Sequence, residues 1–102
     1  MKTKVATDIW PNGQKRYEIP YVNGKRHGLD IWWHINGKKW HEIPYVNGKR
    51  HDLEVEWYPN EQKQRETPYV NGQIYGLVTR CFSDGSLSNF QKWHQDQWVW
   101  GV

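Results

Sequence analysis

Apolar and polar residues alternate along the chain between short turn-forming segments. From residue 27 to residue 35, one side of the alternation carries His27, Leu29, Ile31, Trp33 and Ile35, and the other carries Gly28, Asp30, Trp32 and His34. The same order returns with His51, Leu53, Val55 and Trp57. A period of two residues is typical of β-strands whose two faces differ. The pattern therefore predicts an all-β protein.

Asn-Gly pairs and related residues mark the turns, because both central positions of a type I′ turn need a positive φ. The turn residues are separated alternately by 11 and 13 positions, and they are Asn12, Asn23, Asn36, Asn47, Asn60, Asn71 and Asp84. Seven turns at this spacing join about eight short strands into an elongated antiparallel meander, a single twisted sheet. Because proline lacks a backbone donor, we expect irregular pairing at Pro20, Pro44 and Pro68.

The tetrapeptide Tyr-Val-Asn-Gly occurs three times, beginning at Tyr21, Tyr45 and Tyr69, so its period is 24 residues. A fixed period of this size indicates a repeat architecture in which each unit packs on the next. An eroded fourth copy has Trp93 in the tyrosine position. We expect one repeat domain over residues 1–102, with an N-terminal arm at 1–8 and repeats at about 9–32, 33–56, 57–80 and 81–102.

The two faces of the predicted sheet differ in polarity. We expect the leucines to share an apolar face with Ile19, Tyr21, Ile43, Tyr45 and Tyr69, and the prolines to lie on a charged face with Glu18, Glu42 and Glu66. A sheet needs its apolar face covered. We expect the sheet to coil around that face and form a concave groove. Cover by a second copy of the chain or by another partner is the alternative.

Composition narrows the class of protein. Aromatic residues make up 16% of the chain, with eight tryptophans, which excludes a disordered protein. The mean hydropathy of −1.03 and a hydrophobic fraction of 36% favour one extended layer over a two-layer core. The net charge of +3 comes without a long basic run, so the nucleic-acid signal is weak. The single Cys81 and the lack of a signal-like or membrane-spanning segment make a cytoplasmic protein the default expectation.

The segment Tyr21-Val22-Asn23-Gly24-Lys25-Arg26-His27-Gly28-Leu29 resembles the core of a MORN repeat. It is most similar to the bacterial variant built on Tyr-x-Asn-Gly-Lys-x-x-Gly, found in proteins often labelled antitoxin components. The resemblance covers roughly residues 10–102, although Asp52 replaces the glycine and Gln73 replaces the lysine in later copies. It implies a β-hairpin repeat and a role as an adaptor or protein-binding module, with phospholipid binding also proposed for such arrays.

Side chains capable of catalysis or metal binding do not form a recognisable motif. The glutamates recur with the repeat, so each meets the same environment, whereas an acid–base pair needs two different ones. The histidines lack metal-ligand spacing, and His27 and His51 are expected to hydrogen-bond the backbone of the turn that each flanks. Cys81 falls at an apolar position, and the serines gather at one turn. We expect no enzyme activity, no cofactor and no metal.

The aromatic residues that do not recur at equivalent positions of the other units are the candidate binding residues. Trp32 and Trp40 are replaced by other residue types in the other units, and both fall on the face assigned as charged. Tryptophan is enriched at interface hot spots. We expect Trp32, Trp40 and Tyr58 to anchor a partner, with Arg26 and Arg50 as rim charges. Trp98 and Trp100 form a second candidate, and a strand that caps the array is the competing interpretation of the tail.

These observations favour a non-enzymatic protein-binding module. In the bacterial or phage setting that the resemblance implies, such a module could act as an antitoxin or as an inhibitor of a host or competing protein. The alternative is binding to anionic phospholipid or to single-stranded nucleic acid, because basic and aromatic residues together suit both ligands.

Overall fold

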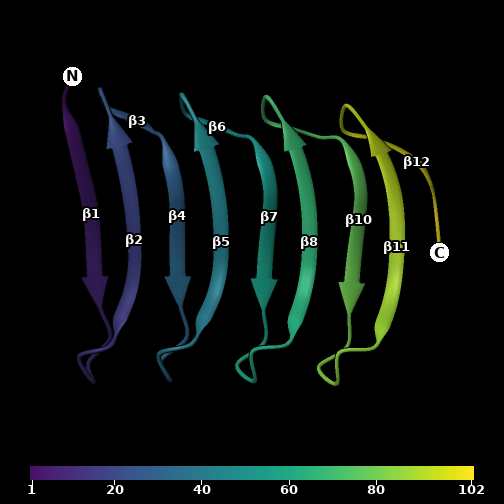
Figure 1. Ribbon diagram of the computed structural model, residues 1–102, viewed down its shortest axis with the longest axis horizontal. Coiled ribbons are helices and arrows are strands. Elements are labelled where there is room, and N and C mark those ends of the chain that lie inside the picture. Colours follow the sequence, from purple (N-terminus) through teal and green to yellow (C-terminus); the bar gives the residue numbers. More distant parts are fainter.

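The computed structural model describes residues 1–102 as one open antiparallel sheet without helices (Figure 1). The class and the meander are therefore confirmed. The sheet has twelve strands instead of about eight: β1 (Thr3–Ile9), β2 (Lys15–Val22), β3 (Lys25–Arg26), β4 (Gly28–Trp33), β5 (Lys39–Val46), β6 (Lys49–Arg50), β7 (Asp52–Trp57), β8 (Lys63–Val70), β9 (Gln73–Ile74), β10 (Gly76–Cys81), β11 (Leu87–His94) and β12 (Gln97–Gly101).

Backbone conformation explains the higher strand number. Three expected strands are each split into a two-residue strand and a longer one, because Gly28, Asp52 and Gly76 have positive φ values of 111°, 79° and 125°. The fourth additional strand, β12, follows a turn in which Gln95 and Asp96 adopt the left-handed conformation in place of Asn-Gly. Residues 3–8, which lie in the segment expected as an N-terminal arm, belong to β1.

The main strands follow one another across the sheet in the order β1-β2-β4-β5-β7-β8-β10-β11-β12. Pairing within a hairpin is extensive: β4 pairs with β5 from Gly28 opposite Tyr45 to Trp33 opposite Lys39. Pairing between hairpins is brief, since β2 meets β4 only at Tyr17 opposite Trp32 and at Glu18 opposite Ile31. The ladder between hairpins stops before each proline, whereas the ladder within each hairpin continues through it, so the expected irregular pairing is confirmed on one side of the strand.

The two faces are composed differently from the expectation. The two-residue turn pairs Val22 with Lys25, so Tyr21 lies opposite Arg26 and not on the side of His27 and Leu29. Directly opposed residues share a face. The tyrosines and Ile19 and Ile43 therefore lie with Asp30 and Trp32, on what we call the tyrosine face. Leu29 and Ile31 lie opposite Pro44 and Glu42, on what we call the proline face. Each face thus mixes residues that the alternation had separated.

The sheet remains a shallow single layer. Its Cα atoms extend 40 × 33 × 12 Å, the strands are bowed, and β1 and β12 form two separate edges (Figure 1). Only eight of 102 residues are buried, and the hydrophobic ones are Ile19, Ile43, Tyr45, Val55 and Val78. The expected coiling around the apolar face therefore does not occur. No helix of the structure could span a membrane.

Candidate binding site on the tyrosine face

A groove on the tyrosine face contains four of the predicted binding residues. Its volume is about 310 Å³, and Arg26, Trp32, Trp40 and Arg50 all line it, together with Asp30, His41, Ile43 and Tyr45. The indole rings of Trp32 and Trp40 meet edge to face, with centroids 6.3 Å apart. Trp32 also packs against Tyr17 at 4.7 Å, while Trp40 packs against the ring of His34 at 5.6 Å.

A β-bulge brings Trp40 to this groove. Trp32 pairs with His41 and Trp33 pairs with Lys39, so Trp40 is the extra residue of its strand. Bulges re-aim side chains that strict alternation would send to the other face. The bulge recurs in every unit, where Arg16, Gln64 and Ser88 are the extra residues. Only the second unit places a tryptophan there, and that indole remains 39% exposed.

Arginines and tyrosines alternate along one wall of the groove. Arg26 Nη1 donates to the Tyr45 hydroxyl at 3.2 Å, and Arg50 Nη1 donates to the Tyr69 hydroxyl at 3.1 Å. Each guanidinium also lies over the ring that it reaches, at 5.3 and 5.4 Å from the centroids. The two predicted rim charges are therefore held in place by the neighbouring repeat, and each presents a fixed, half-exposed guanidinium to the groove.

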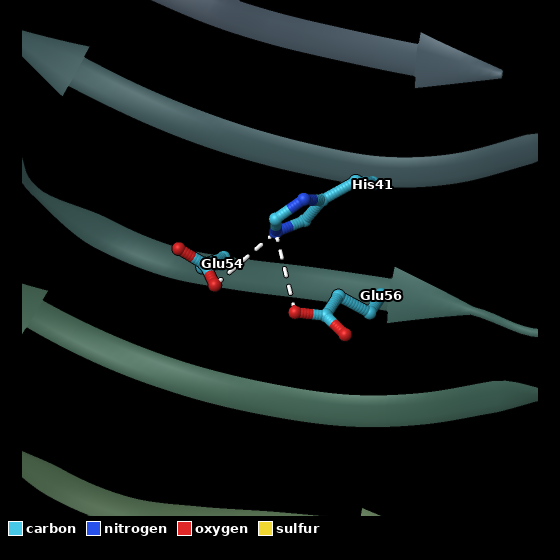
Figure 2. Close-up of side chains that lie close together, drawn as sticks. All are labelled: His41, Glu54 and Glu56. Atoms are coloured by element: carbon cyan, nitrogen blue, oxygen red, sulfur yellow. Dashed lines mark ion pairs between the residues drawn. The ribbon is translucent and has the colours of Figure 1, made fainter.

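A charged cluster lies beside the groove, where His41 from β5 points between Glu54 and Glu56 of β7 (Figure 2). His41 Nε2 is 3.2 Å from Glu54 Oε2 and 3.5 Å from Glu56 Oε1. Arg50 Nη1 reaches the other oxygen of Glu54 at 2.9 Å, and Arg65 pairs with Glu56. Glu54 itself is 3% exposed.

Imidazole and carboxylate groups at this spacing are a ligand set that could hold a cation. A cation would have to share both carboxylates with the guanidinium groups of Arg50 and Arg65. The two arginines already balance the two glutamates in charge. The cluster therefore fits an ion-pair network better than a metal centre.

The acid at the centre of this network differs from its equivalent one repeat earlier. Burial acts to raise the pKa of Glu54, but the hydrogen bond from His41 and the charge of Arg50 outweigh it, and the pKa lies below its usual value. Burial raises the pKa of Asp30, and the charge of Arg26 offsets only part of the effect. Arg26 Nε lies 3.6 Å from Asp30 Oδ2, a longer ion pair than either of those that Glu54 makes.

Tyr58 does not line the groove of Trp32 and Trp40. Its hydroxyl donates to the Cys81 carbonyl at 2.8 Å and so ties its unit to the next. Trp10 and His34 occupy the equivalent positions, and their ring nitrogens reach the carbonyls of Trp33 and Trp57 at 3.1 and 2.9 Å. Tyr58 also borders a second hollow of about 350 Å³ with Arg65 and Arg80, but it belongs to a series of residues that join successive repeats.

The two tail tryptophans lie on opposite faces of β12. Trp98 pairs with Trp93 on the tyrosine face, whereas Trp100 pairs with Lys92 and packs edge to face against Phe90 at 5.7 Å. The tail pairs with β11 along its length, which is the position expected of a capping strand. The structure therefore does not join Trp98 and Trp100 into one patch.

Sequence reasoning missed the cluster of His41, Glu54 and Glu56. The repeat contained the necessary signal: Tyr17 pairs with Trp32, and the same register one unit later pairs His41 with Glu56. Treating all glutamates alike hid the fact that Glu54 takes a buried position. His27 and His51 do hydrogen-bond turn backbone, but their Nδ1 atoms accept from the turn of the next repeat, at the N–H of Asn47 and Asn71 (3.2 and 3.4 Å), and not from the turn that each flanks.

Comparison with known proteins gives one match. A sequence profile described as a MORN repeat variant matches residues 2–23. The matched segment contains β1, the first turn and β2, which together form the first hairpin of the sheet. The match begins within the segment expected as an N-terminal arm. No curated protein and no solved structure matches the chain.

Proposed function

We propose that this MORN-repeat-like protein is a non-enzymatic protein-binding module whose site is the groove around Trp32 and Trp40. MORN repeats are associated in general with binding, including interactions with membrane lipid. The observation that carries the proposal is the pairing of two tryptophans that the repeat does not require, at the mouth of a groove walled by fixed arginines. Large aromatic rings beside arginine are the composition of interface hot spots.

The groove indicates the chemistry of the partner. Arg26 and Arg50 border it, and the acids nearby are turned inward, with Asp30 1% and Glu54 3% exposed. The accessible charge is therefore positive, while the indole rings offer apolar contact area. A protein segment with an apolar anchor next to an acidic side chain fits both features. As part of this proposal, the module acts in the cytoplasm of a bacterial cell as an antitoxin or as an inhibitor of another protein.

The test compares three baits in an affinity pull-down from the native host: wild type, Trp32→Ala/Trp40→Ala, and the control Trp98→Ala/Trp100→Ala. Losing two hot-spot tryptophans should weaken binding by about 100-fold or more. The control removes the same side chains from the far edge and should retain the partner. Circular dichroism checks that each bait is folded, and a single Trp40→Ala variant serves if the double variant is not. Equal retention by all baits contradicts the site.

Binding to anionic lipid or single-stranded nucleic acid is the weaker candidate. The groove presents two accessible guanidinium groups, Arg26 and Arg50, whereas lipid and nucleic-acid phosphates are bound by clusters of several basic residues. Phosphate binding falls steeply as salt rises. Binding of wild type to phosphatidylserine vesicles or to an oligonucleotide at low salt, with loss at higher salt, would favour this candidate over a protein partner.

A further inference from the structure

The proline face carries an apolar stripe that crosses most of the sheet. Val5 lies opposite Pro20, Leu29 opposite Pro44, and Leu53 opposite Pro68. Because the pairs recur at equivalent positions of successive repeats, the side chains form one continuous row over β1 to β10. We call this row the leucine–proline stripe; its members are Val5, Pro20, Leu29, Pro44, Leu53, Pro68 and Leu77.

The stripe is open to solvent. Val5 is 56% exposed, and Leu29, Leu53 and Leu77 are 48%, 40% and 46% exposed. A second row beside it adds Val46 and Val70 at 45% and 43%. On the tyrosine face, by contrast, the aliphatic side chains Ile19, Ile43 and Val78 are buried. Contiguous exposed apolar surface of this kind marks an interaction site.

The border of the stripe is polar, and on the side of the glutamates its charges are paired. Each glutamate beside it pairs with the lysine three residues earlier: Lys15–Glu18 at 2.6 Å, Lys39–Glu42 at 2.7 Å and Lys63–Glu66 at 3.0 Å. These charges are matched within one chain, whereas Lys25 and Lys49, opposite Val22 and Val46, form no ion pair and leave that side of the face positive. An apolar centre with a polar rim is the anatomy of a protein interface.

The protein exposes more surface than a globular monomer of its size. Its accessible surface is 6728 Å², whereas a 12.3 kDa monomer exposes about 6,100 Å². The face of the sheet measures 40 × 33 Å, a footprint of about 1,300 Å², and a stable interface needs about 800 Å² from each partner. One face is therefore large enough to form a complete interface by itself.

We propose that a second copy of the chain covers the leucine–proline stripe, so that two sheets stack with their proline faces together. In a two-fold dimer, the same patch meets itself and must be self-complementary. A regular apolar row meets that requirement. Packed sheets lie about 10 Å apart with interdigitating side chains, and leucines at every repeat supply such side chains. The groove of Trp32 and Trp40 stays accessible on the outer face.

The test measures the mass of the particle in solution by analytical ultracentrifugation, from about 1 to about 200 μM protein. Wild type is expected to form dimers. Leu53→Glu at the centre of the stripe should raise the dimer dissociation constant by at least about tenfold, because two carboxylates would enter the apolar interface. The matched control is Trp40→Glu, which places the same charge at an exposed apolar position of the opposite face and should leave the dimer intact.

Three results would overturn the proposal: wild type that stays monomeric over the whole range, a Leu53→Glu dimer as strong as wild type, or a dimer lost equally in Trp40→Glu. Leu53→Ser is a milder variant if the glutamate prevents folding. Sedimentation with phosphatidylcholine vesicles identifies the other possible occupant, since vesicle binding by monomeric wild type that Leu53→Glu abolishes would assign the stripe to lipid. The partner pull-down uses other residues, so either proposal can fail alone.

Discussion

Two successive repeats differ in how they accommodate a buried acid at the same position. Asp30 and Glu54 hold equivalent buried positions, 1% and 3% exposed. Asp30 has one arginine at 3.6 Å, whereas Glu54 has Arg50 at 2.9 Å and His41 at 3.2 Å. The pKa of Asp30 is consequently raised and that of Glu54 lowered. The following repeat has Val78 at the same position, so the fold needs volume there and not charge.

This difference indicates that the two repeats have different roles in the protein. The repeat of Glu54 contains a network of close ion pairs, while the preceding repeat carries an acid with one longer ion pair beneath the Trp32 and Trp40 groove. Buried charges seldom add stability when an apolar residue of similar size would fit. A poorly paired acid below the candidate binding groove is therefore consistent with a site maintained at some cost to stability.

The largest effect should come from removing Arg50. In Arg50→Ala, Glu54 remains buried without its nearest cation, and we expect a loss of about 3 kcal/mol in the free energy of unfolding. Arg26→Ala should cost about 1 kcal/mol, because Asp30 has a longer ion pair and a raised pKa that eases protonation. Urea denaturation measures both. Equal losses would remove the distinction between the two repeats.

Replacing each acid with valine, the residue at the equivalent position 78, should give effects of opposite sign. Asp30→Val removes a poorly paired buried carboxylate, and we expect a gain of about 1 kcal/mol. Glu54→Val leaves His41 and Arg50 without their central partner, and we expect a loss of about 1 kcal/mol. Thermal and urea unfolding test the pair. Two changes of the same sign would show that the acids are equivalent after all.

Acid titration should separate the two positions further. Because the folded pKa of Glu54 lies below 4.5, its stabilising contribution is present above that pH and is lost as pH falls through the folded pKa. The folded pKa of Asp30 lies above 3.8, so its destabilising contribution is present at neutral pH and is relieved as pH falls through that raised value.

Unfolding free energies of wild type, Asp30→Asn and Glu54→Gln between about pH 3 and about pH 7 test these signs. Glu54→Gln should be less stable than wild type at neutral pH and converge with it in acid. Asp30→Asn should be more stable at neutral pH, and its advantage should shrink on acidification. Parallel curves for all three proteins would contradict the assigned pKa directions.

The smallest effects should come from the exposed turns. His27→Ala removes the acceptor of the Asn47 backbone N–H, and we expect a loss of about 0.5 kcal/mol. His51→Ala should cost less, because its bond to Asn71 is longer, at 3.4 Å. Hydrogen exchange at the Asn47 and Asn71 amides reports each bond directly. Faster exchange at Asn71 than at Asn47 in the respective variants would reverse the order.

The sequence predicted the elements of this fold more accurately than the placement of its side chains. Asn23 and Gly24 have the positive φ values, 52° and 80°, that the turn prediction required. The assignment of residues to the two faces was wrong because the alternation was counted straight through the two-residue turn. That turn places Tyr21 opposite Arg26, so the residues after it lie on the other face from the one that the count predicts. Trp40 was correctly grouped with Trp32, although the physical reason is a β-bulge and not simple alternation.

The sequence by itself determined the 24-residue unit, its turns and the antiparallel meander, because these depend on φ preferences and on neighbours close in the chain. Only the tertiary structure decided that Glu54 meets His41 and that Asp30 does not have an equally close set of partners. Those contacts join strands of the same sheet whose register is set by turns and bulges. Repeats with the same backbone arrangement therefore form different sites where the side chains that meet across neighbouring strands differ.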